Sequence, residues 1–166
     1  MKTKIYLETI TNTPKETQIL GYNLGKKLIN QKKNTPKEKQ SKTIILLQGS
    51  LGCGKTIFTK GFIKSFAILQ NICSPTFVIS KTYKNKLHTI YHLDLYRTGL
   101  ETEFLEELLE DLTYQDFVIV EYFQNCSYIF PDFAFLVEMT FLNETQRKIT
   151  IYQNSNLDNK NKNGSK

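Results

Sequence analysis

The chain contains one glycine-rich segment whose spacing strongly limits its fold. Residues 49–56 read Gly-Ser-Leu-Gly-Cys-Gly-Lys-Thr and match the phosphate-binding loop pattern G-x-x-x-x-G-K-[ST] completely. The apolar residues 43–47 precede this segment. Apolar side chains follow it at helical spacing, namely Phe58, Phe62, Phe66 and Leu69. A strand, a loop and a helix in this order direct a helix N-terminus and several backbone N–H groups at one anion. The segment therefore predicts a nucleotide-binding α/β fold.

The fixed positions of the loop give individual residues chemical roles. Lys55 would supply an ammonium for the β- and γ-phosphates, and the Thr56 hydroxyl an oxygen ligand for Mg²⁺. Cys53 is interpreted as a small side chain that fits inside the loop. The sequence has no N-K-x-D segment of the kind that reads guanine, which favours ATP over GTP. We therefore expect ATP and Mg²⁺ as cofactors.

Length and composition favour a single domain. The chain has 166 residues, enough for one substantial core. No apolar run approaches the ~18 residues of a membrane helix, and the basic start lacks the apolar stretch of a secretory signal. The three cysteines lack C-x-x-C spacing and indicate neither a disulfide framework nor a zinc site. We expect a cytoplasmic protein without a membrane partner.

Charge is unevenly distributed along the chain, although the net charge is only +6. Residues 1–43 carry ten lysines against three acids, whereas residues 101–116 carry seven acids and no base. One interpretation is compositional drift, because an A/T-rich genome encodes Lys, Asn and Ile preferentially. The other is a basic surface that meets RNA or an acidic protein. The sequence leaves both interpretations open.

Helical and strand patterns alternate along the rest of the chain. Thr13 to Glu16 form a capping box with Pro14 at the first helical position, so residues 14–30 are expected to be an amphipathic helix. Residues 30–42 are polar and predict a surface loop. A second amphipathic helix is expected at residues 101–112. Further strands are expected at residues 5–10, 76–83, 88–95, 117–120, 133–141 and 147–152, the second and third as a hairpin.

This succession predicts an α/β, three-layer P-loop NTPase-type domain with a mostly parallel central sheet. The domain is expected to span residues 1–152. Residues 153–166 are polar and of low complexity, which predicts a disordered tail.

Two acidic side chains follow predicted strands and are candidates for work on the metal or the attacking water. Asp94 follows the predicted strand segment at residues 90–93, and Glu121 follows the continuous apolar run at 117–120. His92 lies on the same strand as Asp94 and is interpreted as a packed or hydrogen-bonded side chain. The chain has only two arginines, Arg97 and Arg147, and this shortage argues against a small-molecule kinase with an arginine-rich lid.

Several motifs occur in an order that resembles one known family. They are Glu16-Thr17 followed by Gly21, the phosphate loop with Phe58 and Gly61, Ser74-Pro75-Thr76-Phe77, His92-Leu93-Asp94-Leu95-Tyr96-Arg97, and Val118-Ile119-Val120-Glu121. Together they resemble the TsaE (YjeE) family over about residues 5–150. The resemblance implies a small ATPase of bacterial tRNA threonylcarbamoyladenosine synthesis. It also implies TsaB-like and TsaD-like protein partners, with tRNA as an indirect partner and direct contact left open.

The same resemblance implies roles for individual residues. Thr17 would contact the base or sugar of the nucleotide, and Arg147 would reach the nucleotide from the last strand. Thr56 and Glu121 would hold Mg²⁺, while Asp94 would orient or deprotonate the water. The phosphates would be cradled by Leu51, Gly52, Cys53, Gly54, Lys55 and Thr56. Lys55, Asp94 and Glu121 are therefore the candidate catalytic residues, and Ser74-Pro75-Thr76 would form a switch-like loop.

The sequence also departs from the family pattern. Tyr122 stands where the family usually has Trp, and Ser50 stands where it usually has an acid. We expect slow ATP hydrolysis by the chain alone and completion of the site by a partner. Two alternatives stay open: a nucleotide-dependent assembly switch with little hydrolysis, and a small-molecule phosphotransferase.

Overall fold

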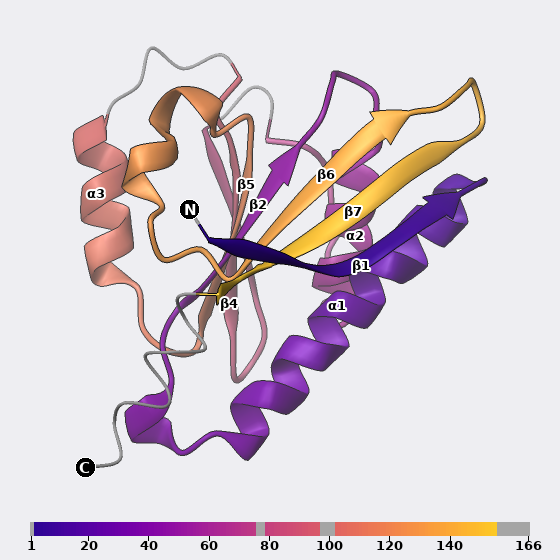
Figure 1. Cartoon of the computed structure of the whole chain (residues 1–166). Coiled ribbons are helices and arrows are strands. Elements are labelled where there is room, and N and C mark those ends of the chain that lie inside the picture. Colours follow the sequence, from indigo (N-terminus) through magenta and orange to yellow (C-terminus); the bar gives the residue numbers. More distant parts are fainter. Residues whose placement is uncertain (1, 76–78, 97–101, 156–166) are drawn as a thin grey trace.

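A seven-stranded mixed sheet forms the centre of the protein (Figure 1). The computed structural model describes residues 2–75, 79–96 and 102–155. The strands are β1 (Thr3–Thr11), β2 (Thr43–Gln48), β3 (Ser80–Lys84), β4 (Thr89–Asp94), β5 (Asp116–Glu121), β6 (Phe135–Phe141) and β7 (Arg147–Asn154). The helices are α1 (Pro14–Asn34), α2 (Lys55–Lys64) and α3 (Thr102–Asp111), with short 3₁₀ turns η1 (Lys37–Lys39) and η2 (Gln124–Ile129).

The strand order is β1-β7-β6-β2-β5-β4-β3. The four central strands β6, β2, β5 and β4 run parallel to one another. The outer strands β7, β1 and β3 pair antiparallel with their neighbours. The predicted α/β domain with a mostly parallel central sheet is therefore confirmed, and its antiparallel strands lie toward the edges.

Two apolar cores separate the structure into three layers. β2 contributes to both cores because its side chains alternate: Ile45 and Leu47 pack toward α1 and α2, whereas Ile44 and Leu46 pack toward α3. Figure 1 shows α3 on one side of the sheet and α1 with α2 on the other. A strand covered on both faces carries apolar side chains at successive positions, which explains the continuous apolar runs at residues 44–47 in β2 and 117–120 in β5.

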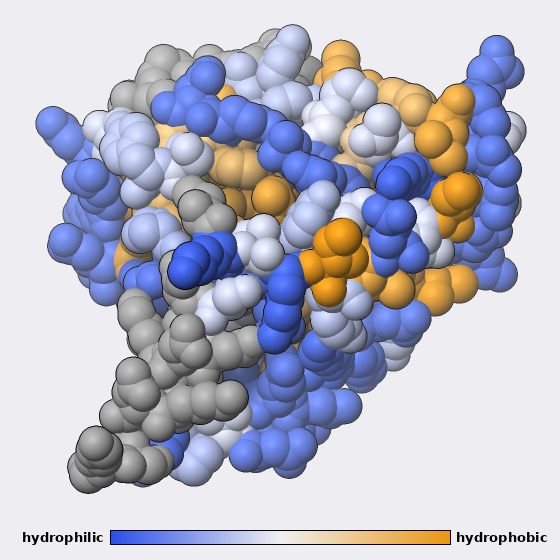
Figure 2. Space-filling model, viewed as in Figure 1, coloured by the Kyte–Doolittle hydropathy of each residue, from blue (hydrophilic) through white to orange (hydrophobic). Residues whose placement is uncertain are grey.

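The antiparallel part of the sheet is less covered than the centre. Figure 2 shows apolar side chains among hydrophilic ones over β1, β6 and β7. Ile5, Ile10 and Phe141 are exposed there. An antiparallel sheet tolerates one solvated face, whereas the parallel centre requires helices on both.

Within the described ranges, no helix is long and apolar enough to cross a membrane. Cys53, Cys73 and Cys126 are free thiols.

Glycines allow α1 and α2 to approach each other closely. A Cβ at Gly21 would overlap the carbonyl oxygen of Phe58, and one at Gly61 would overlap the carbonyl oxygen of Gln18. The contact seats α2 against the sheet, and α2 begins at Lys55 of the phosphate loop. The distance between the two helices therefore helps to position the loop.

Replacing Gly61 with alanine is expected to lower the free energy of unfolding by about 3 kcal/mol, because the added methyl group must push the two helices apart. Urea denaturation measures the loss. Lys64→Ala, at an exposed position of the same helix, is the control and should change stability by less than about 0.5 kcal/mol. A Gly61→Ala protein as stable as the wild type would contradict the close approach.

Several element boundaries differ from those predicted. α1 continues to Asn34, so residues 31–34, which were predicted only as part of the surface loop, are helical. α2 ends at Lys64 because the backbone turns through a left-handed φ of 57° at Ala67. Leu69 is therefore 98% exposed and does not belong to the apolar face predicted for that helix.

The C-terminal boundary and the hairpin also differ in detail. β7 continues through Asn154, two residues past the predicted domain end, and Asn154 is buried. The remainder of the predicted tail, from residue 156, lies outside the described residues. β3 and β4 pair antiparallel as the predicted hairpin requires. Residues 76–78 of its first predicted strand also lie outside the described part of the chain.

Several lysines of the basic N-terminal portion are engaged within the fold. Lys32 donates to the carbonyl oxygens of Ser41 and Tyr114, and burial lowers its pKa to about 8. Lys27 lies 3.5 Å from the centroid of the Tyr6 ring. Both lysines lie on α1 and contact neighbouring segments, so some of the basic residues in the N-terminal portion help to pack α1 within the fold.

Candidate functional site

The glycine-rich loop connects β2 to α2 at the carboxyl end of the parallel strands. Gly54 is the N-cap of α2 and has a left-handed φ of 113°, which favours glycine. A Cβ at Gly49 would lie 2.6 Å from the Cys53 sulfur and would also overlap the carbonyl oxygen of Met139. The loop is thus compact because glycines leave room for its own backbone and for the buried Cys53 side chain.

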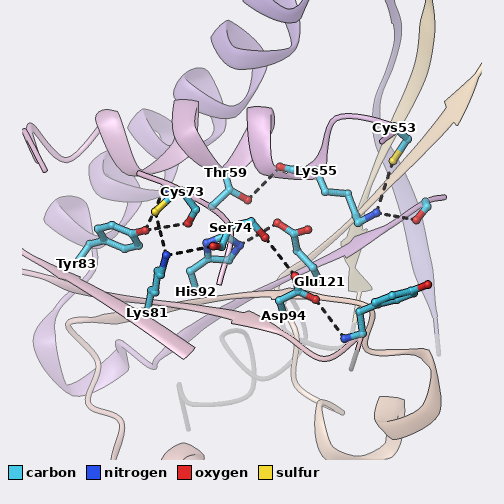
Figure 3. Close-up of polar contacts among 12 residues, drawn as sticks. Cys53, Lys55, Thr59, Cys73, Ser74, Lys81, Tyr83, His92, Asp94 and Glu121 are labelled. Carbon is cyan, nitrogen blue, oxygen red and sulfur yellow. Dashed lines mark hydrogen bonds and ion pairs between the residues drawn. The ribbon is translucent and has the colours of Figure 1, made fainter. Parts of the chain in front are cut away.

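The Lys55 ammonium lies inside the curve of this loop. Its Nζ atom donates to the carbonyl oxygens of Gly49 at 2.8 Å and Ser50 at 3.0 Å. Figure 3 shows the ammonium beside the Cys53 sulfur. It also lies 4.1 Å from the centroid of the Tyr122 ring, and the whole residue is 4% exposed. The loop carbonyls and the aromatic face together stabilise a positive charge at the predicted phosphate position.

Tyr122 covers this ammonium because of an unusual backbone conformation. It follows β5 directly and has a left-handed φ of 58°, which is uncommon for a residue other than glycine. Its ring packs against that of Tyr96, with the two centroids 4.7 Å apart. The two tyrosines therefore form an aromatic pair beside the loop. Tyr122 departs from the family pattern, and Tyr96 belongs to a motif that resembles the family, but the contact between the two rings was not predicted.

Asp94 and Glu121 lie side by side where two parallel strands end. They are register partners on β4 and β5, and both are buried. The Ser74 hydroxyl donates to Asp94 Oδ2 at 3.2 Å, and the Tyr96 backbone N–H donates to Asp94 Oδ1 at 3.2 Å. Ser74 belongs to the predicted switch-like loop and thus touches a candidate catalytic carboxylate. Thr76 of that loop and Arg97 lie outside the described residues.

His92 lies beside a candidate carboxylate, a contact that the sequence did not predict. It is fully buried, and its Nε2 atom lies 2.9 Å from Glu121 Oε1. The interpretation of His92 as a packed, hydrogen-bonded side chain is confirmed. Its partner is a candidate metal ligand rather than a core residue. The signal was the i, i+2 spacing of His92 and Asp94, which puts both side chains on one face of a strand.

Two cavities flank the glycine-rich loop, and their linings include all the residues predicted for catalysis, nucleotide binding or metal binding. The first, of about 260 Å³, is lined by Leu51, Gly52, Gly54, Lys55, Thr56, Asp94 and Glu121, among others. The second, of about 230 Å³, is lined by Thr17, Gly52, Cys53, Gly54 and Arg147, among others. The side chains of Lys55 and Thr56 and the two carboxylates therefore lie on one side of the loop. Thr17, predicted for the base or sugar, and Arg147, predicted to reach the nucleotide, lie on the other side.

The two residues predicted to contact the nucleotide in the second cavity, Thr17 and Arg147, are both bonded to neighbouring residues. The Arg147 guanidinium donates to the carbonyl oxygens of Asn143 and Glu144 and lies 4.3 Å from the Phe141 ring centroid. The Thr17 hydroxyl lies 2.9 Å from the Thr11 hydroxyl. Both predicted residues are thus held in place beside the loop by neighbours on other elements.

Cys53 has the properties of a packing residue. It is fully buried, and burial raises the pKa of its thiol, so the uncharged form is favoured at neutral pH. A protonated, enclosed thiol is a poor nucleophile. The interpretation of Cys53 as a small side chain that fits the loop agrees with this environment.

A larger cavity of about 700 Å³ lies elsewhere, between the end of α1 and the end of β7. It contains none of the predicted site residues. Four lysines line it, of which Lys32 and Lys42 donate to backbone carbonyl oxygens, and no carboxylate lines it within the described part of the chain. Size alone therefore does not make it the better candidate for nucleotide chemistry.

The strand, glycine-rich loop and helix, with acids at the ends of adjacent parallel strands, define a P-loop nucleotide-binding protein. Residues 11–149 match the family model described as threonylcarbamoyl adenosine biosynthesis protein TsaE. The chain belongs to the TsaE family, and the resemblance seen in its motifs is confirmed.

Curated relatives support this assignment. The chain is 36% identical over 113 residues to the tRNA threonylcarbamoyladenosine biosynthesis protein TsaE of Rickettsia felis, covering 68% of this chain and 66% of that protein. It is 30% identical over 110 residues to the TsaE protein of Treponema pallidum, covering 66% of this chain and 81% of that one. The crystal structure of Bacillus subtilis YdiB has the same fold, with a TM-score of 0.71, 22% identity and coverage of 100% and 99%.

Proposed function

We propose that this chain binds and hydrolyses ATP and is needed to form the threonylcarbamoyl group on adenosine in tRNA. It would act in the cytoplasm with TsaB-like and TsaD-like partners. The observation that carries the proposal is the gathering of Lys55, Thr56, Asp94 and Glu121 around one cavity. Family membership supports the tRNA pathway.

The residues around the first cavity fit a triphosphate with Mg²⁺. Thr56, Asp94 and Glu121 offer the hard oxygen atoms that this ion prefers. Within the described residues, no three His, Cys, Asp or Glu side chains form a complete metal site, so phosphate oxygens would complete the coordination. Thr56 and Glu121 would hold the ion, which when bound polarises the phosphate oxygens.

The chain's own residues would then divide the work. The Lys55 ammonium would leave the loop carbonyls of Gly49 and Ser50 and neutralise the β- and γ-phosphates. Asp94, buried and held by Ser74, would orient the attacking water or accept its proton. Thr17 and Arg147 would contact the base or sugar in the second cavity.

Turnover by the chain alone is expected to be slow. Arg147 is engaged with carbonyl groups of the β6–β7 turn, on the other side of the loop from the acids. Leu51 and Tyr96 are exposed at the first cavity, and an apolar rim favours a protein partner. We propose that a partner covers this rim and completes the transition-state charge stabilisation.

The position of Lys55 favours a second candidate function. With its ammonium under Tyr122 and bonded to the loop, the site resembles a resting state that nucleotide must open. A nucleotide-dependent assembly switch with little hydrolysis would use this opening as its signal.

A reconstituted reaction separates the two functions. The chain is mixed with its TsaB-like and TsaD-like partners, tRNA and a threonylcarbamoyl donor, with ATP, a non-hydrolysable ATP analogue or no nucleotide. We expect repeated modification of tRNA with ATP only. Equal modification with the analogue would favour the switch, and modification that does not require the chain would contradict both functions.

A further inference from the structure

His92 is a fully buried histidine with one ring nitrogen bonded to a candidate metal ligand. Its Nε2 atom lies 2.9 Å from Glu121 Oε1, and Figure 3 shows the imidazole directed at that carboxylate. Its Nδ1 atom is buried and has no hydrogen-bond partner in the described part of the chain. A buried polar atom without a partner is costly, so packing alone is a poor reason for histidine here.

The sheet register explains how the two side chains meet. On β4 and β5, Asp94 pairs with Glu121 and His92 pairs with Ile119. Paired residues of neighbouring strands share a face, and so do residues two apart on one strand. His92 therefore lies one step behind the two carboxylates, on the face that carries α2 and the glycine-rich loop.

The contact fixes the direction of the hydrogen bond. A carboxylate that binds a metal ion accepts hydrogen bonds and does not donate them, so in the proposed site Nε2 of His92 would carry the proton and donate. This bond is the one that the Glu121 side chain makes among the described residues. By contrast, Asp94 is held from two directions, by Ser74 and by the Tyr96 backbone. The orientation of Glu121 thus depends on one donor.

We propose that His92 is a positioning residue that holds the Glu121 carboxylate in the orientation needed to bind Mg²⁺ with the nucleotide. The inference rests on the proposed ATP-dependent function. His92 is fully buried and lines neither cavity beside the loop, so it would act through Glu121 alone. A donor behind a metal-binding carboxylate restricts its rotation and thereby lowers the cost of binding the ion.

Substitutions that keep or remove the donor test this role. In His92→Gln the side-chain amide extends to about the position of Nε2, whereas in His92→Asn it stops near the position of Nδ1. We expect His92→Asn to reduce the gain in ADP affinity that Mg²⁺ provides by about 10–100-fold. His92→Gln should restore most of this gain. ADP affinity in EDTA should stay the same in both variants and in the wild type.

The measurement is calorimetric titration of ADP into the full chain, with Mg²⁺ and with EDTA, together with melting temperatures of each variant. His92→Asn combined with Glu121→Gln should lose no more Mg²⁺ dependence than Glu121→Gln alone, because both changes act through one carboxylate. If His92→Asn does not fold, His92→Met replaces it as the variant of similar length without a donor.

The outcomes distinguish the inference from the function on which it rests. Mg²⁺ dependence that is unchanged in His92→Asn, or equally reduced in His92→Gln, would overturn the positioning role and leave the proposed function standing. A wild-type chain that binds neither ADP nor ATP would instead overturn the proposed function. Additive losses in the double variant would show that His92 acts by a route other than Glu121.

Discussion

Lys55→Ala is expected to reduce ATP hydrolysis by at least about 10²-fold, the cost of removing one preorganised group that stabilises transition-state charge. Lys55 is 4% exposed and lies in the cavity that holds Thr56, Asp94 and Glu121. No other lysine lines that cavity in the described ranges. The shortened side chain leaves the phosphates without an ammonium. Release of inorganic phosphate, with the partners present, measures the effect.

Lys64→Ala is the matched control for this experiment. Lys64 carries the same charge on the same helix but is exposed at the far end of α2. Hydrolysis by Lys64→Ala should remain within about twofold of the wild type, because exposed surface substitutions change little. Hydrolysis by Lys55→Ala at the wild-type rate would remove the assignment of the glycine-rich loop to phosphate binding.

The Glu121→Gln and Asp94→Asn variants are expected to lose ATP hydrolysis in different ways, although the two carboxylates are neighbours. Glu121→Gln should lose Mg²⁺-dependent hydrolysis by about 10²-fold or more while nucleotide binding in EDTA persists. Asp94→Asn should lower kcat by about 10²–10⁴-fold, the usual contribution of an acid–base or water-orienting group, with unchanged Mg²⁺ dependence. Both substitutions conserve side-chain shape, so His92 and Ser74 keep their contacts.

Steady-state kinetics over a range of Mg²⁺ concentrations, with nucleotide titrations alongside, separate the two roles. Melting temperatures report whether each buried substitution is tolerated. Equal loss of nucleotide binding and hydrolysis in Glu121→Gln would contradict its metal role. A shifted Mg²⁺ requirement in Asp94→Asn would place both carboxylates on the ion and refute the division of labour.

The parts of the fold that follow from local pattern were predictable. The glycine-rich loop is contiguous in sequence, and its spacing alone requires a strand before it and a helix after it. The Glu121 position followed from an apolar run that ends in an acid, because carboxyl ends of parallel strands meet at one edge of the sheet. Both inferences use short-range sequence and one general rule of topology.

Features that depend on contacts between distant residues could not be predicted. The overlap that forbids a side chain at Gly61 involves Gln18 on another helix. The bond between His92 and Glu121 exists only because two strands pair in one particular register. The backbone at Tyr122 is left-handed and places its ring over Lys55. The sequence does not indicate this conformation, because the residue is neither a glycine nor an asparagine.

The segregation of charge along the chain is also clearer in the structure. Lys27 and Lys32 contact aromatic rings and carbonyl groups within the fold, so they stabilise α1. A direct role of the basic portion in binding tRNA would make binding weaken steeply with added salt. The proposed function does not require that contact, because the partners would carry the tRNA.

The central claim is that ATP turnover by this chain supports threonylcarbamoylation of tRNA. The most direct test is mass spectrometry of tRNA nucleosides from cells depleted of the chain and rescued with wild type, Lys55→Ala or Lys64→Ala. We predict that threonylcarbamoyladenosine falls on depletion and returns with wild type and Lys64→Ala but not with Lys55→Ala. Unchanged threonylcarbamoyladenosine in depleted cells, or full rescue by Lys55→Ala, would contradict the account.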